Sequence, residues 1–155
     1  FGRAWCQKEF EEHGLNGNIC QINTSRTIKK GTMRGIHYQV DPYQESKFLR
    51  CTKGRIFDVM IDLRPDSPTF MQWLGHELSA ENCKMAYVPE NFGHAFLTLE
   101  DNSEVYYPVT QFYTPGAERG IRWNDPAFNI EWPIKVKYVS EKDNNHPDFD
   151  INQLK

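Results

Sequence analysis

The chain has 155 residues, with 18 Lys and Arg against 21 Asp and Glu, which gives a formal net charge of −3. This length suits a single domain over residues 1–155 that needs no disulfide or metal to fold. The basic residues are spread along the chain, which argues against a nucleic-acid partner, and no apolar run approaches the ~20 residues that span a bilayer, which argues against a membrane partner.

Four cysteines, Cys6, Cys20, Cys51 and Cys83, occur without any C-x-x-C spacing. This spacing argues against a zinc ribbon and against a thioredoxin-like redox motif. No secretory signal is visible either. We therefore expect four free thiols in a reducing cytoplasm.

One short helix is expected within residues 5–15, where Gly14 would end it. Strand patterns follow at 19–23, 32–40, 47–52, 55–63, 70–78, 85–88, 94–99 and 104–112, although Pro108 belongs at an edge or bulge. In the clearest strand, 55–63, one face carries Phe57, Val59, Ile61 and Leu63, and the other carries Ile56, Asp58, Met60 and Asp62. Trp123 and Trp132 are expected to dock the C-terminal segment onto the strands. These patterns predict an all-β barrel or sandwich.

Two histidines are the first candidates for chemistry: His37 in a strand, and His94 where a turn leads into a strand. A structural core histidine is the alternative for His37. Metal-binding cupins, which are small β-barrels, carry H-x-H with a later Glu and then P-x-G-x-x-H. Here Tyr38 and Gln39 follow His37, so the first motif is broken, while residues 89–94 keep part of the second. Without a third and fourth ligand we predict a cupin-type barrel or jelly roll with short peripheral helices and no metal.

Other polar residues extend this set. A neutral imidazole such as His37 can remove a weakly acidic proton near neutral pH, and Tyr107 can return one from the opposite side. Lys47 or His94 can stabilise the enolate between the two steps. The alternatives are a surface charge for Lys47, a core aromatic for Tyr107 and a turn cap for Asp143. The set is typical of proton abstraction beside a carbonyl, which needs no cofactor.

Linked motifs run through almost the whole chain: MRGIHYQ (33–39), KFLRC (47–51), GRIFDVMIDLRPDSPTF (54–70), LSAEN (78–82), VPENFGHAF (88–96), ERGIRWNDPAFNIEWP (118–133) and SEKD (140–143). In these motifs the chain resembles the dTDP-4-dehydrorhamnose 3,5-epimerase family of sugar-nucleotide epimerases. The resemblance implies a cupin fold and an isomerase of dTDP-rhamnose biosynthesis. Such an enzyme inverts C3 and C5 of a nucleotide-linked 4-keto-6-deoxyhexose without a cofactor. The first strands of the family, upstream of Phe1, are absent from the sequence.

The resemblance also assigns roles to residues. His37 would be the base, in a dyad with Asp143, and Tyr107 would be the acid on the opposite face of the sugar. Lys47 and His94 would stabilise the enolate, and Asp58 could orient His94, although this last role is our own inference. The substrate-binding set would be Arg34, which contacts the diphosphate, with Gln21, Asn23, Phe1, Arg3 and Arg50.

By the same resemblance the protein would be a homodimer that exchanges N-terminal strands, so that Phe1 and Arg3 reach the neighbouring site. Arg3 stands where family members often have Glu, and Pro108 stands where a Lys often follows the tyrosine, which bears on the identity of the substrate. Strict strand alternation puts Arg34 and His37 on opposite faces, so we expect a bulge at Gly35.

Three alternatives remain open from the sequence. The first is an epimerase that acts at only one carbon, C3 or C5, of another nucleotide sugar. The second is a non-catalytic cupin that binds sugar nucleotides, and the third is a metal-dependent cupin.

Overall fold

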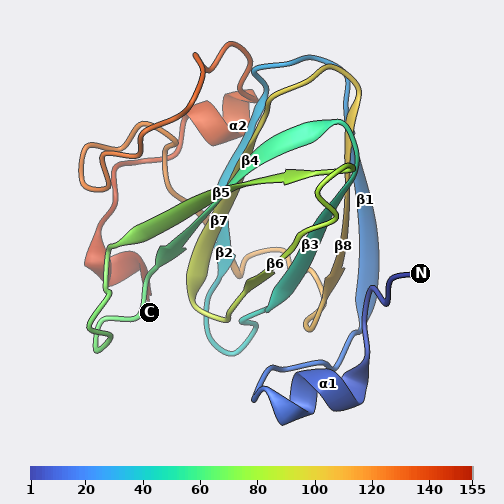
Figure 1. Ribbon diagram of the computed structural model, residues 1–155. Coiled ribbons are helices and arrows are strands. Elements are labelled where there is room, and N and C mark those ends of the chain that lie inside the picture. Colours follow the sequence, from blue (N-terminus) through green and yellow to red (C-terminus); the bar gives the residue numbers. More distant parts are fainter. Residues whose placement is uncertain (155) are drawn as a thin grey trace.

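The structure, a computed structural model, describes residues 1–154 and consists of two antiparallel sheets with short helices at the periphery (Figure 1). One sheet has the strand order β1-β8-β3-β6, and the other has the order β5-β4-β7-β2-β9. The strands are β1 (Gln21–Thr27), β2 (Met33–Gln39), β3 (Lys47–Lys53), β4 (Arg55–Asp62), β5 (Trp73–Ser79), β6 (Met85–Val88), β7 (Phe92–Thr98), β8 (Ser103–Val109) and β9 (Glu118–Gly120). The helices are α1 (Gln7–Glu12), α2 (Glu141–Asn144) and the 3-10 helix η1 (Ile151–Leu154). The predicted all-β jelly roll with short peripheral helices is confirmed.

Apolar residues form two cores, one on each face of the five-stranded sheet. The core between the sheets contains Leu49, Cys51, Ile56, Met60, Leu78, Ala86, Val88, Phe96 and Val105. The second core includes Val59, Ile61 and Leu63 and is covered by the C-terminal segment through Trp123, Trp132 and their neighbours. Strand β4 therefore divides its side chains between the two cores as its alternation predicts. The orange-to-red segment in Figure 1 follows this outer face of the five-stranded sheet.

Strand β5 begins three residues later than the pattern of residues 70–78 predicts. Met71 has a φ of 65°, and the backbone N–H groups of Phe70 and Gln72 donate to Ser67 and Thr69. These contacts make residues 67–72 a turn, although their side chains are those of a strand. Likewise, β1 lies at Gln21–Thr27 rather than 19–23, because it pairs with β8 over its whole length.

Pro108 lies inside β8, between β1 and β3, rather than at a sheet edge. It pairs with Ile22 of β1. On its other side β8 pairs with β3 at Arg50–Tyr106 and again at Lys47–Val109, but not between these two pairs. Pro108 therefore lies where the pairing with β3 is interrupted. A missing N–H is tolerated at such an interruption.

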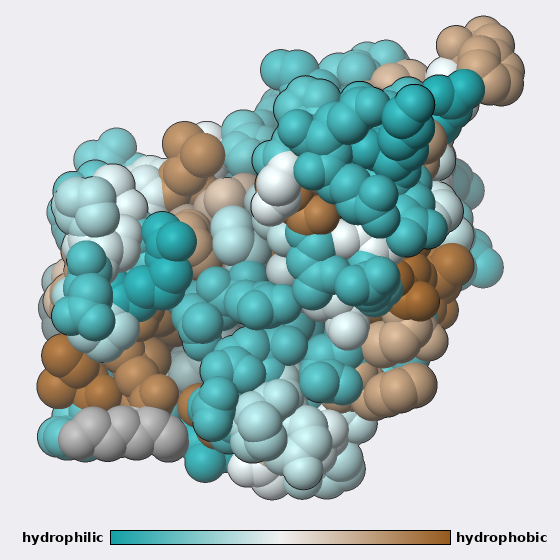
Figure 2. Space-filling view, turned by 90° about the horizontal axis from the view of Figure 1, so that it is seen from below, coloured by the Kyte–Doolittle hydropathy of each residue, from teal (hydrophilic) through white to brown (hydrophobic). Residues whose placement is uncertain are grey.

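The exposed large apolar side chains in the described residues include Phe1, Ile22, Ile28, Leu74, Phe112 and Tyr113. Figure 2 looks onto the end of the molecule that carries α1 and shows a largely hydrophilic surface with separate apolar patches. None of the helices within residues 1–154 has the length and apolarity to cross a bilayer.

Candidate active site

The space between the two sheets opens into two adjoining cavities of about 360 and 260 Å³. Both cavities are lined by His37, Lys47 and Tyr107, which come from β2, β3 and β8. The larger cavity adds Gln21, Asn23, Tyr38, Gln39, Glu45, Val109, Tyr113 and Glu118, and the smaller one adds Ser25, Arg34, Leu49, His94 and Phe96. A candidate base, a candidate acid and a cation thus share one hollow of the barrel.

A bulge in β2 brings Arg34 and His37 to the same cavity. The pairing of β2 with β7 shifts register between Gly35 and His37, as expected from the sequence. Gly35 has a φ of 110°, and a Cβ atom there would lie 2.5 Å from the carbonyl oxygen of His94. Only glycine suits both constraints, so the Gly35 backbone decides where the His37 ring points.

The His37 ring is fixed by a carboxylate from the C-terminal segment. Nε2 of His37 lies 2.7 Å from Oδ1 of Asp143, whose side chain is 4% exposed. A carboxylate only accepts, so Nε2 donates. In the neutral imidazole, Nδ1 then carries the lone pair. Burial alone would raise the pKa of Asp143, but the hydrogen bond and charge of His37, with smaller help from Gly35 N–H, bring that pKa below its ordinary value. The pair is therefore arranged as an imidazole base with its orienting carboxylate.

Helix α2 presents Asp143 to the barrel. The Ser140 hydroxyl caps the helix by accepting from the backbone N–H of Asp143. The Asp143 carboxylate also accepts from the Gly35 N–H at 3.4 Å. The turn that holds the carboxylate and the bulge that holds the histidine are thus connected directly.

A second dyad joins His94 and Asp58. Nε2 of His94 lies 2.8 Å from Oδ1 of Asp58, and both residues are buried. The other oxygen of this carboxylate, Oδ2, is buried without a hydrogen-bond partner. The contact inferred from the sequence is present, and it fixes the ring that faces the smaller cavity.

Tyr107 is held in its phenol form by its surroundings. Burial raises the pKa of Tyr107, and the negative charge of Glu45 raises it further, while Arg34 lowers it. A buried phenol with a raised pKa keeps its proton near neutral pH, which suits a proton donor.

The cavity also contains residues that the sequence analysis missed. Glu45 pairs with Lys47, while Lys142 and Tyr113 both donate to Glu118 at the cavity wall. Glu45 stands two positions before Lys47, so strand parity could have indicated that both face the same side. Glu118 lies on the three-residue strand β9, which is too short to show a periodic pattern.

His146 is a further missed residue, next to the first dyad. Its Nε2 lies 3.8 Å from Asp143 and is buried without a hydrogen-bond partner. Burial lowers the pKa of His146, and so does the charge of His37. The ring packs directly against Gly120, where a Cβ atom would lie 2.1 Å from Nε2.

Three of the predicted substrate-binding residues do not line either cavity. Leu49 and Cys51 point into the core between the sheets, and Arg50 lies between them in β3. Strand alternation therefore places the Arg50 side chain on the face of β3 that points away from that core. Phe1 and Arg3 are exposed, and Arg3 forms an ion pair with Glu9. Within one chain, the structure brings Gln21, Asn23 and Arg34 to the site and leaves these three outside it.

Among residues 1–154, the group of side chains close enough to share a metal ion is His37, Asp143 and His146, with ligand atoms within 4.8 Å of one another. Two of these residues, His37 and Asp143, are already hydrogen-bonded to each other at 2.7 Å. His37 and His94, the pair suggested by the cupin motifs, each bond their own carboxylate instead.

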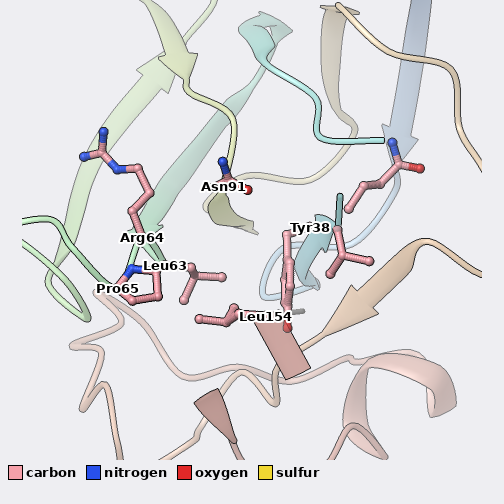
Figure 3. A pocket seen from close by; sticks show the side chains of 8 residues that line it. Tyr38, Leu63, Arg64, Pro65, Asn91 and Leu154 are labelled. Atoms are coloured by element: carbon pink, nitrogen blue, oxygen red, sulfur yellow. The ribbon is translucent and has the colours of Figure 1, made fainter. Parts of the chain in front are cut away.

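A third cavity, of about 220 Å³, lies at the C-terminal end of β2 (Figure 3). Tyr38, Leu63 and Leu154 form its wall, with Arg64, Pro65 and Asn91 nearby. Burial raises the pKa of Tyr38 to about 12. No imidazole or carboxylate lines this cavity in the described residues, so the chemistry is assigned to the cavities that contain His37.

Comparisons with known proteins identify the same family that the sequence motifs resemble. The family model described as dTDP-4-dehydrorhamnose 3,5-epimerase matches residues 1–150. The enzyme of that name from Shigella flexneri is 44% identical over 150 residues, which cover 96% of this chain and 82% of that protein. The crystal structure of the Elizabethkingia anophelis enzyme has a TM-score of 0.93 and 39% identity, covering 96% of this chain and 82% of its own. A Legionella pneumophila epimerase in complex with dTDP-4-keto-L-rhamnose has a TM-score of 0.90 and 35% identity, covering 100% of this chain and 81% of its own.

Proposed function

This chain belongs to the dTDP-4-dehydrorhamnose 3,5-epimerase family, and we propose that His37 and Tyr107 are the two groups that move protons in its reaction. The protein is an isomerase that inverts C3 and C5 of a nucleotide-linked 4-keto-6-deoxyhexose. The single observation that carries the assignment of roles is the His37–Asp143 hydrogen bond in a cavity that Tyr107 also lines.

In the proposed mechanism, the 4-keto group acidifies the protons at C3 and C5. Nδ1 of His37 removes one of these protons, and Asp143 stabilises the imidazolium that forms. Lys47 and His94, which both line the smaller cavity, are assigned to stabilise the negative charge on the 4-oxygen; His94 does so with both ring nitrogens protonated, because Nε2 donates to Asp58 and only Nδ1–H can then donate to that oxygen. Tyr107 then donates its phenolic proton to the opposite face of the carbon, and the configuration inverts. The proton on His37 leaves to solvent and the Tyr107 phenolate regains one, so both groups are reset before the second carbon reacts.

Substrate binding is proposed for the polar residues around this centre. Arg34 faces the smaller cavity and supplies a guanidinium for the diphosphate. Gln21 and Asn23 line the larger cavity from β1 and supply amides for hydroxyl groups. Arg50 faces away from both cavities, so its proposed contact would require the substrate to extend beyond them.

We further propose that the domain, which spans residues 1–155, works as a homodimer in the cytoplasm. Support for a dimer comes from the exposed apolar residues Phe1, Trp5 and Ile22 near the edge strand β1, because an uncovered edge is a site for association. In such a dimer Phe1 and Arg3 could reach the partner's cavity. The free thiols Cys6, Cys20, Cys51 and Cys83 support a reducing compartment.

The activity is tested with dTDP-4-keto-6-deoxyglucose in deuterated buffer, with the product followed by NMR. We expect deuterium at both C3 and C5 and a product with both centres inverted. Label and inversion at a single carbon would instead support the one-carbon epimerase. Binding without any label would support a non-catalytic sugar-nucleotide-binding protein.

A further inference from the structure

Glu45 is a partly buried carboxylate in the cavity, and the mechanism above does not use it. Its Oε1 lies 3.0 Å from Nζ of Lys47, and the two side chains are only 14% and 13% exposed. Both residues line the larger cavity together with His37 and Tyr107. The negative charge of a carboxylate would destabilise an enolate formed nearby. The presence of Glu45 in this cavity therefore calls for a function that outweighs this cost.

One effect of Glu45 is on the position of Lys47. A lysine side chain has four rotatable bonds and about 2 kcal/mol of rotamer entropy. Within the described residues, Glu45 is the carboxylate that pairs with Lys47. The ion pair therefore restricts where Nζ can lie, and it balances the buried ammonium until a substrate oxygen arrives.

A second effect of Glu45 is on Tyr107. After burial, the negative charge of Glu45 is the main factor that raises the pKa of this phenol. Arg34 acts in the opposite direction from β2. Loss of the Glu45 charge would therefore leave Tyr107 easier to ionise, and a phenolate has no proton to donate.

We propose that Glu45 is a positioning residue for the proton return, which tethers Lys47 beside the enolate oxygen and places a negative charge in the cavity that it shares with the Tyr107 phenol. This inference rests on the proposed roles of His37 and Tyr107. It concerns a residue that acts through its neighbours, not one that touches the reacting carbon.

The charged or titratable groups that share the cavity walls with Tyr107 set the background for a test. They are Arg34, His37 and Tyr38 from β2, Glu45 just before β3, Lys47 at the start of β3, His94 from β7, Tyr113 before β9 and Glu118 at the start of β9. Glu118 is paired with Lys142, and His94 is hydrogen-bonded to Asp58. Glu45 is therefore the carboxylate of this set whose partner, Lys47, is itself proposed to turn to the substrate.

The test is Glu45→Gln, which keeps the size of the side chain and removes its charge. We expect kcat to fall about tenfold with KM changed less than about threefold, as for the loss of an interaction made in the transition state. The alkaline limb of the kcat–pH profile should move to lower pH, because the negative charge that opposes ionisation of Tyr107 is gone. Glu81→Gln, which removes an exposed carboxylate that pairs with Arg55, serves as the matched control and should leave the profile unchanged.

A second readout does not depend on turnover. The ionisation of Tyr107 is followed by ultraviolet absorbance, as the difference between proteins with and without Tyr107→Phe, in the wild-type and Glu45→Gln backgrounds. Glu45→Gln should lower the pH at which this phenol ionises. An unchanged alkaline limb and an unchanged titration in folded Glu45→Gln would overturn the inference. An inactive wild-type protein would instead count against the proposed function.

Discussion

The imidazole of His37 and the carboxylate of Asp143 stand 106 positions apart in the chain and lie 2.7 Å apart in the structure. The contact joins the bulge in β2 to helix α2, which carries the acid on the first turn after its Ser140 cap. The orientation of the proposed base thus depends on the C-terminal segment folding back across the five-stranded sheet.

Asp143→Asn should lower kcat by roughly 10²–10⁴-fold with a much smaller change in KM. An amide in place of the carboxylate neither stabilises the imidazolium nor enforces the tautomer with a free Nδ1. Steady-state kinetics on dTDP-4-keto-6-deoxyglucose measure both constants. The control is Asp148→Asn, which removes a more exposed carboxylate of the same segment. A loss of less than tenfold in Asp143→Asn would show that the dyad does not orient the base.

Gly35→Ala should destabilise the protein more than Gly116→Ala. Both glycines have positive φ, at 110° and 91°, but nothing lies within 4 Å of a Cβ at Gly116, while one at Gly35 meets the His94 carbonyl at 2.5 Å. Backbone strain alone costs about 1–2 kcal/mol, so Gly116→Ala should lose about that much and Gly35→Ala clearly more. Denaturant unfolding measures the difference, and equal losses would mean that the bulge has room for a side chain.

Asp62→Asn should lower the free energy of unfolding by about 2 kcal/mol at pH 7. Hydrogen bonds from Arg64 are the main cause that holds the pKa of Asp62 well below its ordinary range, with Ser67 and Thr69 contributing. Stability from such a group is present above its unfolded pKa and is lost as the pH falls through its lower folded pKa. The difference between wild type and Asp62→Asn should therefore shrink below about pH 4. Asp66→Asn, which removes an exposed acid four positions further along the chain, is the control and should cost much less stability at pH 7.

Chelator treatment should leave kcat unchanged. The proposed steps use only side chains, and the two cavity histidines are each hydrogen-bonded to a carboxylate. The measurement compares activity before and after dialysis against EDTA, with metal content determined in parallel. A loss of activity that a divalent ion restores would support the metal-dependent cupin.

The sequence predicts the elements that have a regular alternation of apolar and polar residues, and the positions where that alternation breaks. Alternation in β4 places Asp58 on the inner face, and the conflict between Arg34 and His37 indicates the bulge at Gly35. Patterns fail where backbone geometry overrides composition, as at Met71, whose positive φ delays β5. They also fail for β9, where three residues are too few to show a period and only tertiary pairing with β2 makes a strand.

Only part of the candidate site can be predicted from the sequence. The motifs indicate residues that carry chemistry by type, such as His37 and Tyr107. They do not indicate which additional charges the fold places next to them. Glu45 and His146 are examples. Each lies in a loop, Glu45 just before β3 and His146 just after α2, and only the fold brings it beside the proposed catalytic groups.

The division of work between His37 and Tyr107 is tested most directly by deuterium exchange in two variants, Tyr107→Phe and His37→Asn. Each is incubated in deuterated buffer with dTDP-4-keto-6-deoxyglucose, and the recovered sugar is examined by NMR. Tyr107→Phe should retain exchange at the reacting carbon without inverting it, because the base still works and the opposite proton donor is gone. His37→Asn should show neither exchange nor inversion. Full inversion by Tyr107→Phe, or exchange by His37→Asn at the wild-type rate, would contradict the mechanism.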